Sequence, residues 1–260
     1  MKSTLDEKEV RRLAKGCGYD IHTVDEIDST NNELKRLAAE GKPGGYLLAA
    51  SRQTAGRGRL GRSFFSPKSG VYLSLLLRPE TTPDRTLFLT TAAAVAVCRA
   101  IESVSDERAE IKWVNDVYIS KRKVCGILTE ASVSGSLTEW AVVGIGVNIT
   151  PPEGGFPEEI ADRAGAIFNG GNAPDGFENR LTAAIALELE RVYLQPHSVT
   201  AQEYRSRSLI IGKRITVVNG AERLYCRAVD VDDEARLEVE YDDGRRAKLF
   251  SGEVERVILE

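Results

Sequence analysis

The spacing of hydrophobic residues divides the chain into two parts. Up to about residue 206, helical spacing alternates with short apolar runs, whereas from Lys213 onward apolar and polar residues alternate. Thr4 with Glu7 and Thr30 with Glu33 fit capping boxes at the first two helices. The first part predicts helices over residues 4–17, 30–40, 85–104, 177–194 and 200–208, and strands over 46–51, 71–77, 110–114, 124–131 and 140–149.

The second part is typical of short strands at intervals of roughly ten residues. Asn219-Gly220 and Asp243-Gly244 have the composition of tight hairpin turns. We therefore predict an α+β domain over residues 1–206 and a small all-β barrel over residues 207–260. Residues 151–176 are rich in proline, glycine and acidic side chains, which predicts a long loop with one helical turn.

Composition narrows the class of protein. Of 260 residues, 42% are hydrophobic and the formal net charge is −4, which fits a folded domain rather than a disordered chain or a polycation. The N-terminus lacks the apolar stretch of a signal peptide, and residues 86–101 are interrupted by Thr90, Thr91 and Arg99, so we expect no membrane span. Four scattered cysteines and two distant histidines predict neither zinc nor redox chemistry and fit the reducing cytoplasm.

Residues 51–67 form a loop in which glycines alternate with arginines. No acidic residue lies among its cations, which are Arg52, Arg57, Arg59, Arg62 and the adjacent Lys68. Glycine lets backbone N–H groups approach an anion, and guanidinium groups bind carboxylate or phosphate through two hydrogen bonds. The glycines match the G-x-G-x-x-G dinucleotide motif, but that motif opens a helix, whereas here a proline and a strand follow. The pattern favours an anion-binding loop, with a solvated basic loop as the alternative.

Two further polar segments fall at the ends of predicted strands. KWVND spans residues 112–116, GIGVN spans residues 144–148, and Lys123 with Gly126 enters the strand between them. Taken singly, Trp113 is more typical of a core than of a ligand contact. Together with the basic loop, these segments predict a pocket for an anion and a nucleotide.

These motifs occur in the order seen in biotin protein ligases. Ser29-Thr30-Asn31, GRGRLGR over residues 56–62, KWVND, the Lys123/Gly126 pair and GIGVN resemble that family from about Ser29 to the C-terminus. The resemblance implies a catalytic domain similar to class II tRNA synthetases, with a mixed sheet, followed by an SH3-like barrel. It also implies an enzyme that makes biotinyl-5′-AMP from biotin and ATP with Mg²⁺, then passes the biotinyl group to one lysine of a biotin carboxyl carrier domain of a carboxylase.

The same resemblance assigns roles to residues of this sequence. Expected to bind biotin are Ser29, Thr30, Gln53, Gly56, Arg57, Lys123, Gly126 and Gly144. Expected to bind ATP are Arg59, Arg62, Phe64, Lys112, Asn115 and Asn148. Lys123, Arg57 and Asp116 are the expected catalytic residues, with Asp116 either holding Mg²⁺ or accepting a proton from the incoming lysine. The cations would lower the repulsion between two anionic substrates.

The sequence departs from the family pattern at Val114, where proline is usual, and at Phe64, where tryptophan is common. About 28 residues precede Ser29, and one short helix does not make a helix-turn-helix, so we expect no DNA binding. Family members often self-associate, which leaves a homodimer open. The nearest alternative is a lipoate or octanoate ligase of the same fold. A nucleic-acid-binding protein is disfavoured because residues 221–260 carry 12 acidic and 7 basic side chains.

Overall fold

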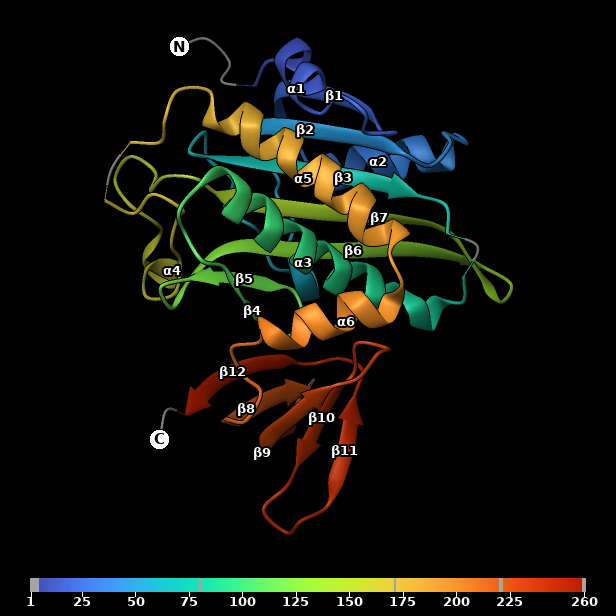
Figure 1. Cartoon of the computed structure of the whole chain (residues 1–260), viewed down its shortest axis with the longest axis vertical. Helices are drawn as coiled ribbons and strands as arrows, with labels where there is room; N and C mark the ends of the chain where they lie inside the picture. Colours follow the sequence, from blue (N-terminus) through green and yellow to red (C-terminus); the bar gives the residue numbers. More distant parts are fainter. Residues whose placement is uncertain (1–4, 80, 171, 220–221, 259–260) are drawn as a thin grey trace.

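A seven-stranded mixed sheet organises the larger part of the structure (Figure 1). The computed structural model describes residues 5–79, 81–170, 172–219 and 222–258. The strand order is β1-β2-β3-β7-β6-β5-β4, in which β1 and β2 are parallel and all other neighbours are antiparallel. The strands are β1 (Asp20–Ile27), β2 (Tyr46–Gln53), β3 (Gly70–Leu77), β4 (Glu110–Lys112), β5 (Asp116–Ile119), β6 (Arg122–Ser134) and β7 (Leu137–Asn148).

Helices cover both faces of this sheet. On one face α3 packs with α5 and α6 over the main hydrophobic core, and α1 packs against α5. On the other face α2 buries a smaller cluster with β2, β3 and β7. The helices are α1 (Glu7–Leu13), α2 (Thr30–Ala39), α3 (Thr86–Val104), α4 (Glu158–Ala161), α5 (Phe177–Leu194) and α6 (His197–Ser206), with 3-10 turns at Arg59–Gly61 and Pro83–Arg85.

The central strands present side chains of different size to the two faces. On β7, Val143, Ile145 and Val147 belong to the core beneath α3 and α5. Because successive residues of a strand point to opposite faces, Gly144 and Gly146 point to the face that carries α2. On this face β7 therefore carries no side chain at two consecutive positions, 144 and 146.

Helix α3 is the most apolar element of the chain. By length and composition it would be long and apolar enough to cross a membrane, but 67% of that stretch is buried inside the protein. Its residues from Ala92 to Ile101, except Arg99, belong to the core between the sheet and α5. Core packing accounts for its hydrophobicity.

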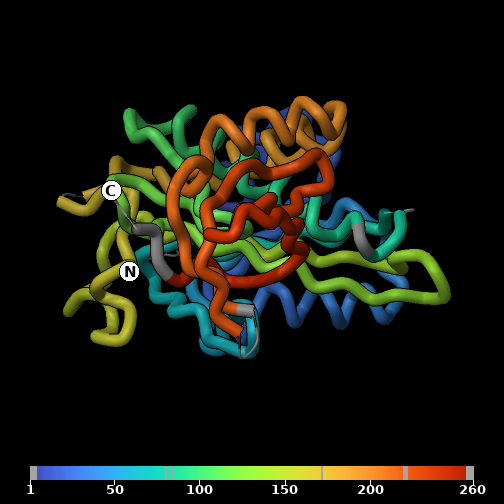
Figure 2. Tube along the Cα trace, turned by 90° about the horizontal axis from the view of Figure 1, so that it is seen from below, coloured from blue at the N-terminus to red at the C-terminus, as the bar shows by residue number. Residues whose placement is uncertain are grey.

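The C-terminal part forms a second, five-stranded antiparallel sheet in the order β11-β10-β9-β8-β12. Seen from below, it lies across one end of the larger body (Figure 2). Its interior is continuous with the main core, and the buried Trp113 indole donates a hydrogen bond to Ala235 O at 3.0 Å. The strands are β8 (Arg214–Asn219), β9 (Glu222–Val231), β10 (Leu237–Glu240), β11 (Arg246–Leu249) and β12 (Glu253–Ile258).

The segment between α6 and β8 is itself tied to the first sheet. Ile111 N donates to Arg207 O and Leu209 N donates to Ile111 O, both at 2.8 Å. The connection therefore runs along the free edge of β4. This pairing, together with Trp113, holds the second sheet against the strand that carries KWVND.

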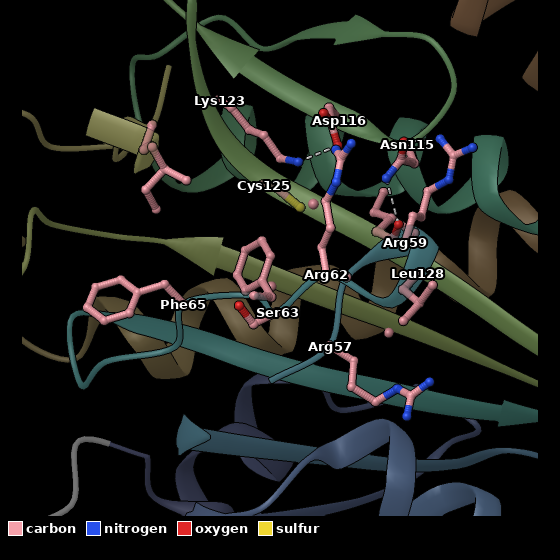
Figure 3. A pocket seen from close by; sticks show the side chains of 18 of the residues that line it. Arg57, Arg59, Arg62, Ser63, Phe65, Asn115, Asp116, Lys123, Cys125 and Leu128 are labelled. Atoms are coloured by element: carbon pink, nitrogen blue, oxygen red, sulfur yellow. Dashed lines mark hydrogen bonds and ion pairs between the residues drawn. The ribbon is translucent and has the colours of Figure 1, made fainter. Parts of the chain in front are cut away.

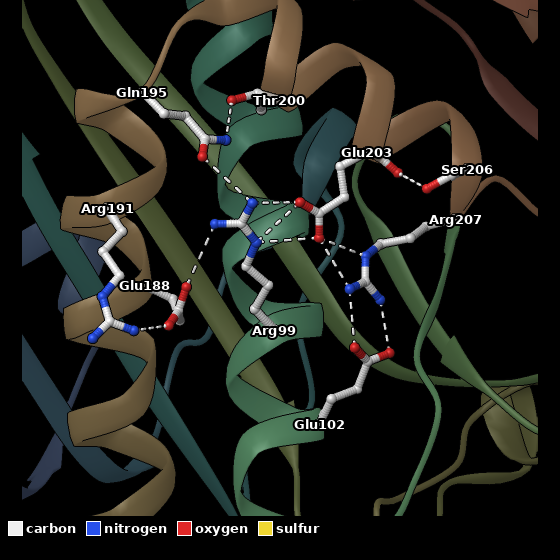
Figure 4. A network of polar contacts seen from close by, with 9 residues as sticks. All are labelled: Arg99, Glu102, Glu188, Arg191, Gln195, Thr200, Glu203, Ser206 and Arg207. Atoms are coloured by element: carbon white, nitrogen blue, oxygen red, sulfur yellow. Dashed lines mark hydrogen bonds and ion pairs between the residues drawn. The ribbon is translucent and has the colours of Figure 1, made fainter.

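An ion-pair network joins α3, α5 and α6 on the far side of the core (Figure 4). Arg99 and Arg207 both bind Glu203, with Nε–Oε distances of 3.0 Å, and Arg207 also pairs with Glu102 at 2.7 Å. Burial alone would raise the pKa of Glu203, but the hydrogen bonds from the two arginines outweigh it and hold that pKa below its usual value. The network fastens the last helix before the second sheet to the core.

Hydrophobic spacing predicts most of these elements, but β1 and β5 have no counterpart among them. β1 is an edge strand in which only Ile21 is buried, so its sequence lacks an apolar run. β5 is four residues long and is followed by a turn in which Ser120 and Lys121 have positive φ. Short or half-exposed strands show too little alternation of apolar and polar residues to be predicted from the sequence.

Both N-cap predictions differ from the structure. Thr4 lies outside the described residues, and α1 begins after Asp6, whose carboxylate accepts hydrogen bonds from Lys8 N and Glu9 N. The cap at Thr30 is wrong by one residue, because the Ser29 hydroxyl accepts from Asn32 N and Thr30 is already helical. This shift releases the Thr30 hydroxyl for other contacts.

Candidate active site

A cavity of about 550 Å³ lies on the α2 face of the sheet, enclosed by the glycine-rich strands, the basic loop and the start of β12. Every site residue expected from the sequence lines it except Gly56. Neither histidine does, and three of the four cysteines are buried and unpaired, with the remaining Cys17 half-buried. The motifs that are scattered along the chain therefore meet at one place.

Three glycines form the floor of the cavity. A Cβ atom on Gly146 would lie 2.5 Å from Phe64 Cε1, and one on Gly126 would lie 2.9 Å from Phe64 Cε2. A Cβ on Gly144 would lie 1.9 Å from Asn31 Oδ1. The floor thus has no room for a larger residue, and the Phe64 ring rests on it in this structure.

The basic loop spans residues 54–69, since β2 continues through Gln53 and β3 begins at Gly70. Arg57 pairs with Glu130 of β6 at 3.1 Å. Arg59 donates to Asn115 Oδ1 at 2.9 Å and to Gly252 O at 3.0 Å, so it bridges KWVND and the second sheet.

Arg62 makes a second contact with the C-terminal sheet, an ion pair of 2.7 Å with Glu253. The hydrogen bond from Arg62 holds the pKa of Glu253 below its usual value. Arg52 and Lys68 instead pair with acidic residues of β1 and do not line the cavity. The absence of acids between these cations in sequence does not leave them unpaired in space, because the acids come from other strands.

Lys123 and Asp116 form an ion pair inside the cavity, with 2.7 Å between Nζ and Oδ1 (Figure 3). In the same view Arg62 reaches toward this pair, whereas Arg57 points the other way. Lys112 lies nearby, 5.8 Å from the centre of the Tyr118 ring, and burial lowers the pKa of its ammonium group. The five cationic side chains expected from the sequence thus face one cavity, and Asp116 is paired with one of them.

Amide and hydroxyl groups line the end of the cavity below α2. Gln53 Oε1 accepts from Thr30 N at 2.9 Å, and Gln53 Nε2 donates to Ser66 Oγ at 3.1 Å. At the other end, Asn148 Nδ2 donates to Gly165 O at 2.9 Å and Asn115 Nδ2 to Ile127 O at 2.9 Å. These contacts fix the side-chain amides before any ligand enters.

Gly56 is the exception among the expected residues. It is buried beside the loop, where a Cβ would lie 2.4 Å from both Phe64 O and Ser66 Oγ. This close packing of the loop on itself explains why position 56 is a glycine. Gly56 therefore lies behind the residues that line the cavity, and its expected role in biotin binding stays a prediction.

The cavity also contains residues for which no role was expected from the sequence. Asn31 is one of them, although it belongs to the Ser29-Thr30-Asn31 motif. Arg163 comes from the loop before α5, and its carbonyl accepts from Lys123 N at 2.8 Å. Glu253 arrives from β12. Only the tertiary structure brings the last two to the site.

The fold and the site together define a class of protein that holds anionic small molecules between a mixed sheet and an arginine-rich loop. Comparison with known proteins narrows this class. Residues 24–148 match the model of the biotin/lipoate A/B protein ligase family. The bifunctional ligase/repressor BirA of Bacillus spizizenii is 34% identical over 261 residues, which cover 96% of this chain and 79% of that protein.

Two further relatives agree. The biotin–[acetyl-CoA-carboxylase] ligase of Mycobacterium tuberculosis is 32% identical over 268 residues, covering 98% of this chain and 96% of that protein. The biotin protein ligase of Aquifex aeolicus, solved in complex with biotin and ATP, superimposes with a TM-score of 0.72 at 28% identity, covering 89% of this chain and 96% of that one. The chain belongs to the biotin protein ligase family.

Proposed function

We propose that this chain activates biotin with ATP to biotinyl-5′-AMP and transfers the biotinyl group to a specific lysine of a biotin carboxyl carrier domain. The observation that carries the proposal is the convergence of Arg57, Arg59, Arg62, Lys112 and Lys123 on a glycine-floored cavity. The family membership and the ligands of the Aquifex aeolicus structure support it.

The first half-reaction joins two anions, which is where the cations matter. A carboxylate oxygen of biotin attacks the α-phosphorus of ATP, the bond to the bridging oxygen breaks, and pyrophosphate leaves with the electron pair. Arg57 and Lys123 would lie at the carboxylate and the α-phosphate, and Arg59, Arg62 and Lys112 along the remaining phosphates. Preorganised positive groups of this kind stabilise charge that develops in the transition state.

We assign the uncharged wall of the cavity to binding. Ser29, Thr30 and Gln53 would hydrogen-bond the ureido ring of biotin over the floor of Gly126 and Gly144. Asn115 and Asn148 would contact the adenosine end, where Phe64 would cover the adenylate. Since the Phe64 ring rests on Gly126 and Gly146 in this structure, it has to move aside for biotin to reach the floor.

In the second half-reaction the amine of the carrier lysine attacks the biotinyl carbonyl carbon, and AMP leaves with the electrons of the broken C–O bond. The amine must lose a proton, and the carboxylate of Asp116, which lines the cavity, would accept it. Its pairing with Lys123 at 2.7 Å keeps a cation beside the same carbonyl. Each transfer thus forms one amide bond and releases one AMP.

Magnesium fits this site only as part of a nucleotide complex. In the part of the chain that the structure describes, no three or more His, Cys, Asp or Glu residues cluster closely enough to cage a metal ion. Mg²⁺ commonly binds through one or two carboxylates plus substrate phosphates. Asp116 would be the protein ligand, and the bound ion would neutralise phosphate charge.

The fold type, the cellular location and the oligomeric state also follow from what is expected of the family. We infer that the mixed sheet is of the class II tRNA synthetase type and that residues 207–260 are a separate SH3-like barrel, which the five-strand antiparallel order supports. Unpaired cysteines support a cytoplasmic enzyme. A homodimer and the lack of DNA binding stay predictions, testable by light scattering and by a gel shift at several salt concentrations.

The direct test of the transfer step uses a carrier domain and its lysine-to-arginine variant. With biotin and Mg-ATP, the carrier should gain the mass of one biotinyl group and the variant should not. The second candidate is a lipoate or octanoate ligase, because the matching family model also covers lipoate ligases. Lipoylation of a lipoyl domain without biotinylation of the carrier would favour it.

A further inference from the structure

Glu130 of β6 does not line the cavity itself but binds three groups at once, two of which, Asn31 and Arg57, do line it. Its Oε1 accepts from Lys35 Nζ at 2.8 Å and from Arg57 at 3.1 Å, and its Oε2 accepts from Asn31 Nδ2 at 3.0 Å. Its side chain is 20% exposed. Burial alone would raise the pKa of Glu130, but the hydrogen bonds from Lys35 and Asn31 outweigh it and hold that pKa below its usual value. The group is therefore a carboxylate, which accepts hydrogen bonds and donates none.

This charge fixes the direction of the hydrogen bonds behind it. Glu130 only accepts, and so does the carbonyl oxygen of Leu128, 3.4 Å from Asn31 Nδ2, so the NH₂ group of Asn31 faces them and Asn31 Oδ1 faces Ser74 Oγ at 2.6 Å. The Ser74 hydroxyl is fully buried and also lies 2.7 Å from Thr30 Oγ1. It carries one proton, and the amide oxygen of Asn31 can only accept, so that proton goes to Asn31.

The direction of the hydrogen bonds of the Thr30 hydroxyl follows from this arrangement. Since Ser74 donates to Asn31, the Thr30 hydroxyl donates its own proton within the network, either to Ser74 Oγ at 2.7 Å or to Gln53 Oε1 at 3.1 Å. The lone pairs of its oxygen are then acceptors on a residue that lines the cavity. A ligand N–H would find an acceptor there, and a ligand acceptor would be repelled.

We propose that Glu130 is a positioning residue for the biotin end of the cavity, acting through Asn31 and Ser74 to present Thr30 as a hydrogen-bond acceptor. The inference rests on the proposed function, because the ureido ring of biotin offers two N–H donors and is the group that such an acceptor selects. Lys35 serves the arrangement by keeping Glu130 ionised. Ser74, which lies below the cavity and does not line it, is the second positioning residue.

The test measures the steady-state kinetics of biotinyl-AMP formation for Glu130→Gln, Ser74→Ala and the double variant. Glutamine keeps the shape of Glu130 but removes its charge, so the Asn31 amide loses the stronger of the two acceptors that hold its present orientation. We expect each single variant to raise the KM for biotin about tenfold, the usual range for a hydrogen bond to a charged or buried group, with kcat and the KM for ATP within about twofold. Because both act on one chain of hydrogen bonds, the double variant should also lie near tenfold instead of about a hundredfold.

Glu139→Gln is the matched control, since Glu139 belongs to the neighbouring strand β7, accepts from Ser132 Oγ at 3.2 Å and does not line the cavity. It should leave the KM for biotin unchanged. Thermal unfolding of each variant separates misfolding from a change in the site. If Glu130→Gln does not fold, the KM of Ser74→Ala for biotin still tests the hydrogen-bond chain. If the wild type makes no biotinyl-AMP, the proposed function fails. If the wild type makes it, a KM for biotin within twofold of wild type in folded Glu130→Gln, or additive effects in the double variant, overturns the role of Glu130.

Discussion

Replacing Lys123 by alanine removes the cation that pairs with Asp116 at 2.7 Å and that we place beside the reacting carboxyl group. A unit charge about 4 Å from a developing charge is worth about 4 kcal/mol at an effective dielectric constant of 20. Lys123 is 28% exposed, so solvent screening reduces this figure. We therefore expect biotinyl-AMP formation to slow by about 10²–10³-fold, the range found when one preorganised group is removed from an active site.

The assay is a single-turnover reaction with excess enzyme over biotin, quenched at intervals and analysed for biotinyl-AMP. Lys68→Ala is the control, because Lys68 belongs to the same positive region of sequence but pairs with Asp25 outside the cavity. That variant should react at the wild-type rate. A Lys123→Ala protein that unfolds like the wild type and still forms the adenylate at the wild-type rate would refute the electrostatic reasoning.

Further predictions concern the floor, the loop and the far side of the core. Gly144→Ala should raise the KM for biotin at least about tenfold in steady-state assays, because its Cβ would lie 1.9 Å from Asn31 Oδ1; an unchanged KM would contradict the tight floor. Trypsin should cut the loop over residues 54–69 more slowly with biotin and Mg-ATP than without, and equal rates would count against a loop that orders on ligand. Glu203→Ala should lower the free energy of urea unfolding by about 2–3 kcal/mol while kcat is retained, because two arginines lose their shared partner. The pKa of Glu203 in the folded protein is held below the usual 4.5, so the loss in free energy of unfolding should be full above about pH 4.5 and should shrink as the pH falls through that lower pKa. A loss that does not depend on pH would show that it does not come from the charge of Glu203.

Elements with a strong apolar period could be predicted from the sequence. The expected helix over residues 177–194 is α5 to the residue, because its leucines and isoleucines keep one face in the core. β1 could not be found in this way, since an edge strand with one buried residue carries no such signal. The cap at Ser29 shows a second limit: Ser29 and Thr30 are both capping residues, and only the backbone conformation decides between them.

The site was predictable where a motif concentrates its chemistry in one short segment. Lys112, Asn115 and Asp116 line the cavity as the KWVND pattern predicted, and Trp113 is a core residue, as its type suggested. Glu130 was out of reach, because nothing in the sequence of β6 indicates that it meets Asn31, which lies 99 residues earlier in the chain. Contacts between strands that are distant in sequence depend on the order of the strands in the sheet, and hydrophobic spacing does not predict that order.

Adenylation of biotin in this cavity can be tested in a single reaction. The protein is incubated with biotin and Mg-ATP without any carrier domain, and the mixture is analysed by mass spectrometry for biotinyl-5′-AMP and pyrophosphate. We expect both products from biotin and neither product when lipoate or octanoate replaces biotin. Adenylate from lipoate or octanoate, with none from biotin, would show that biotin is not the substrate.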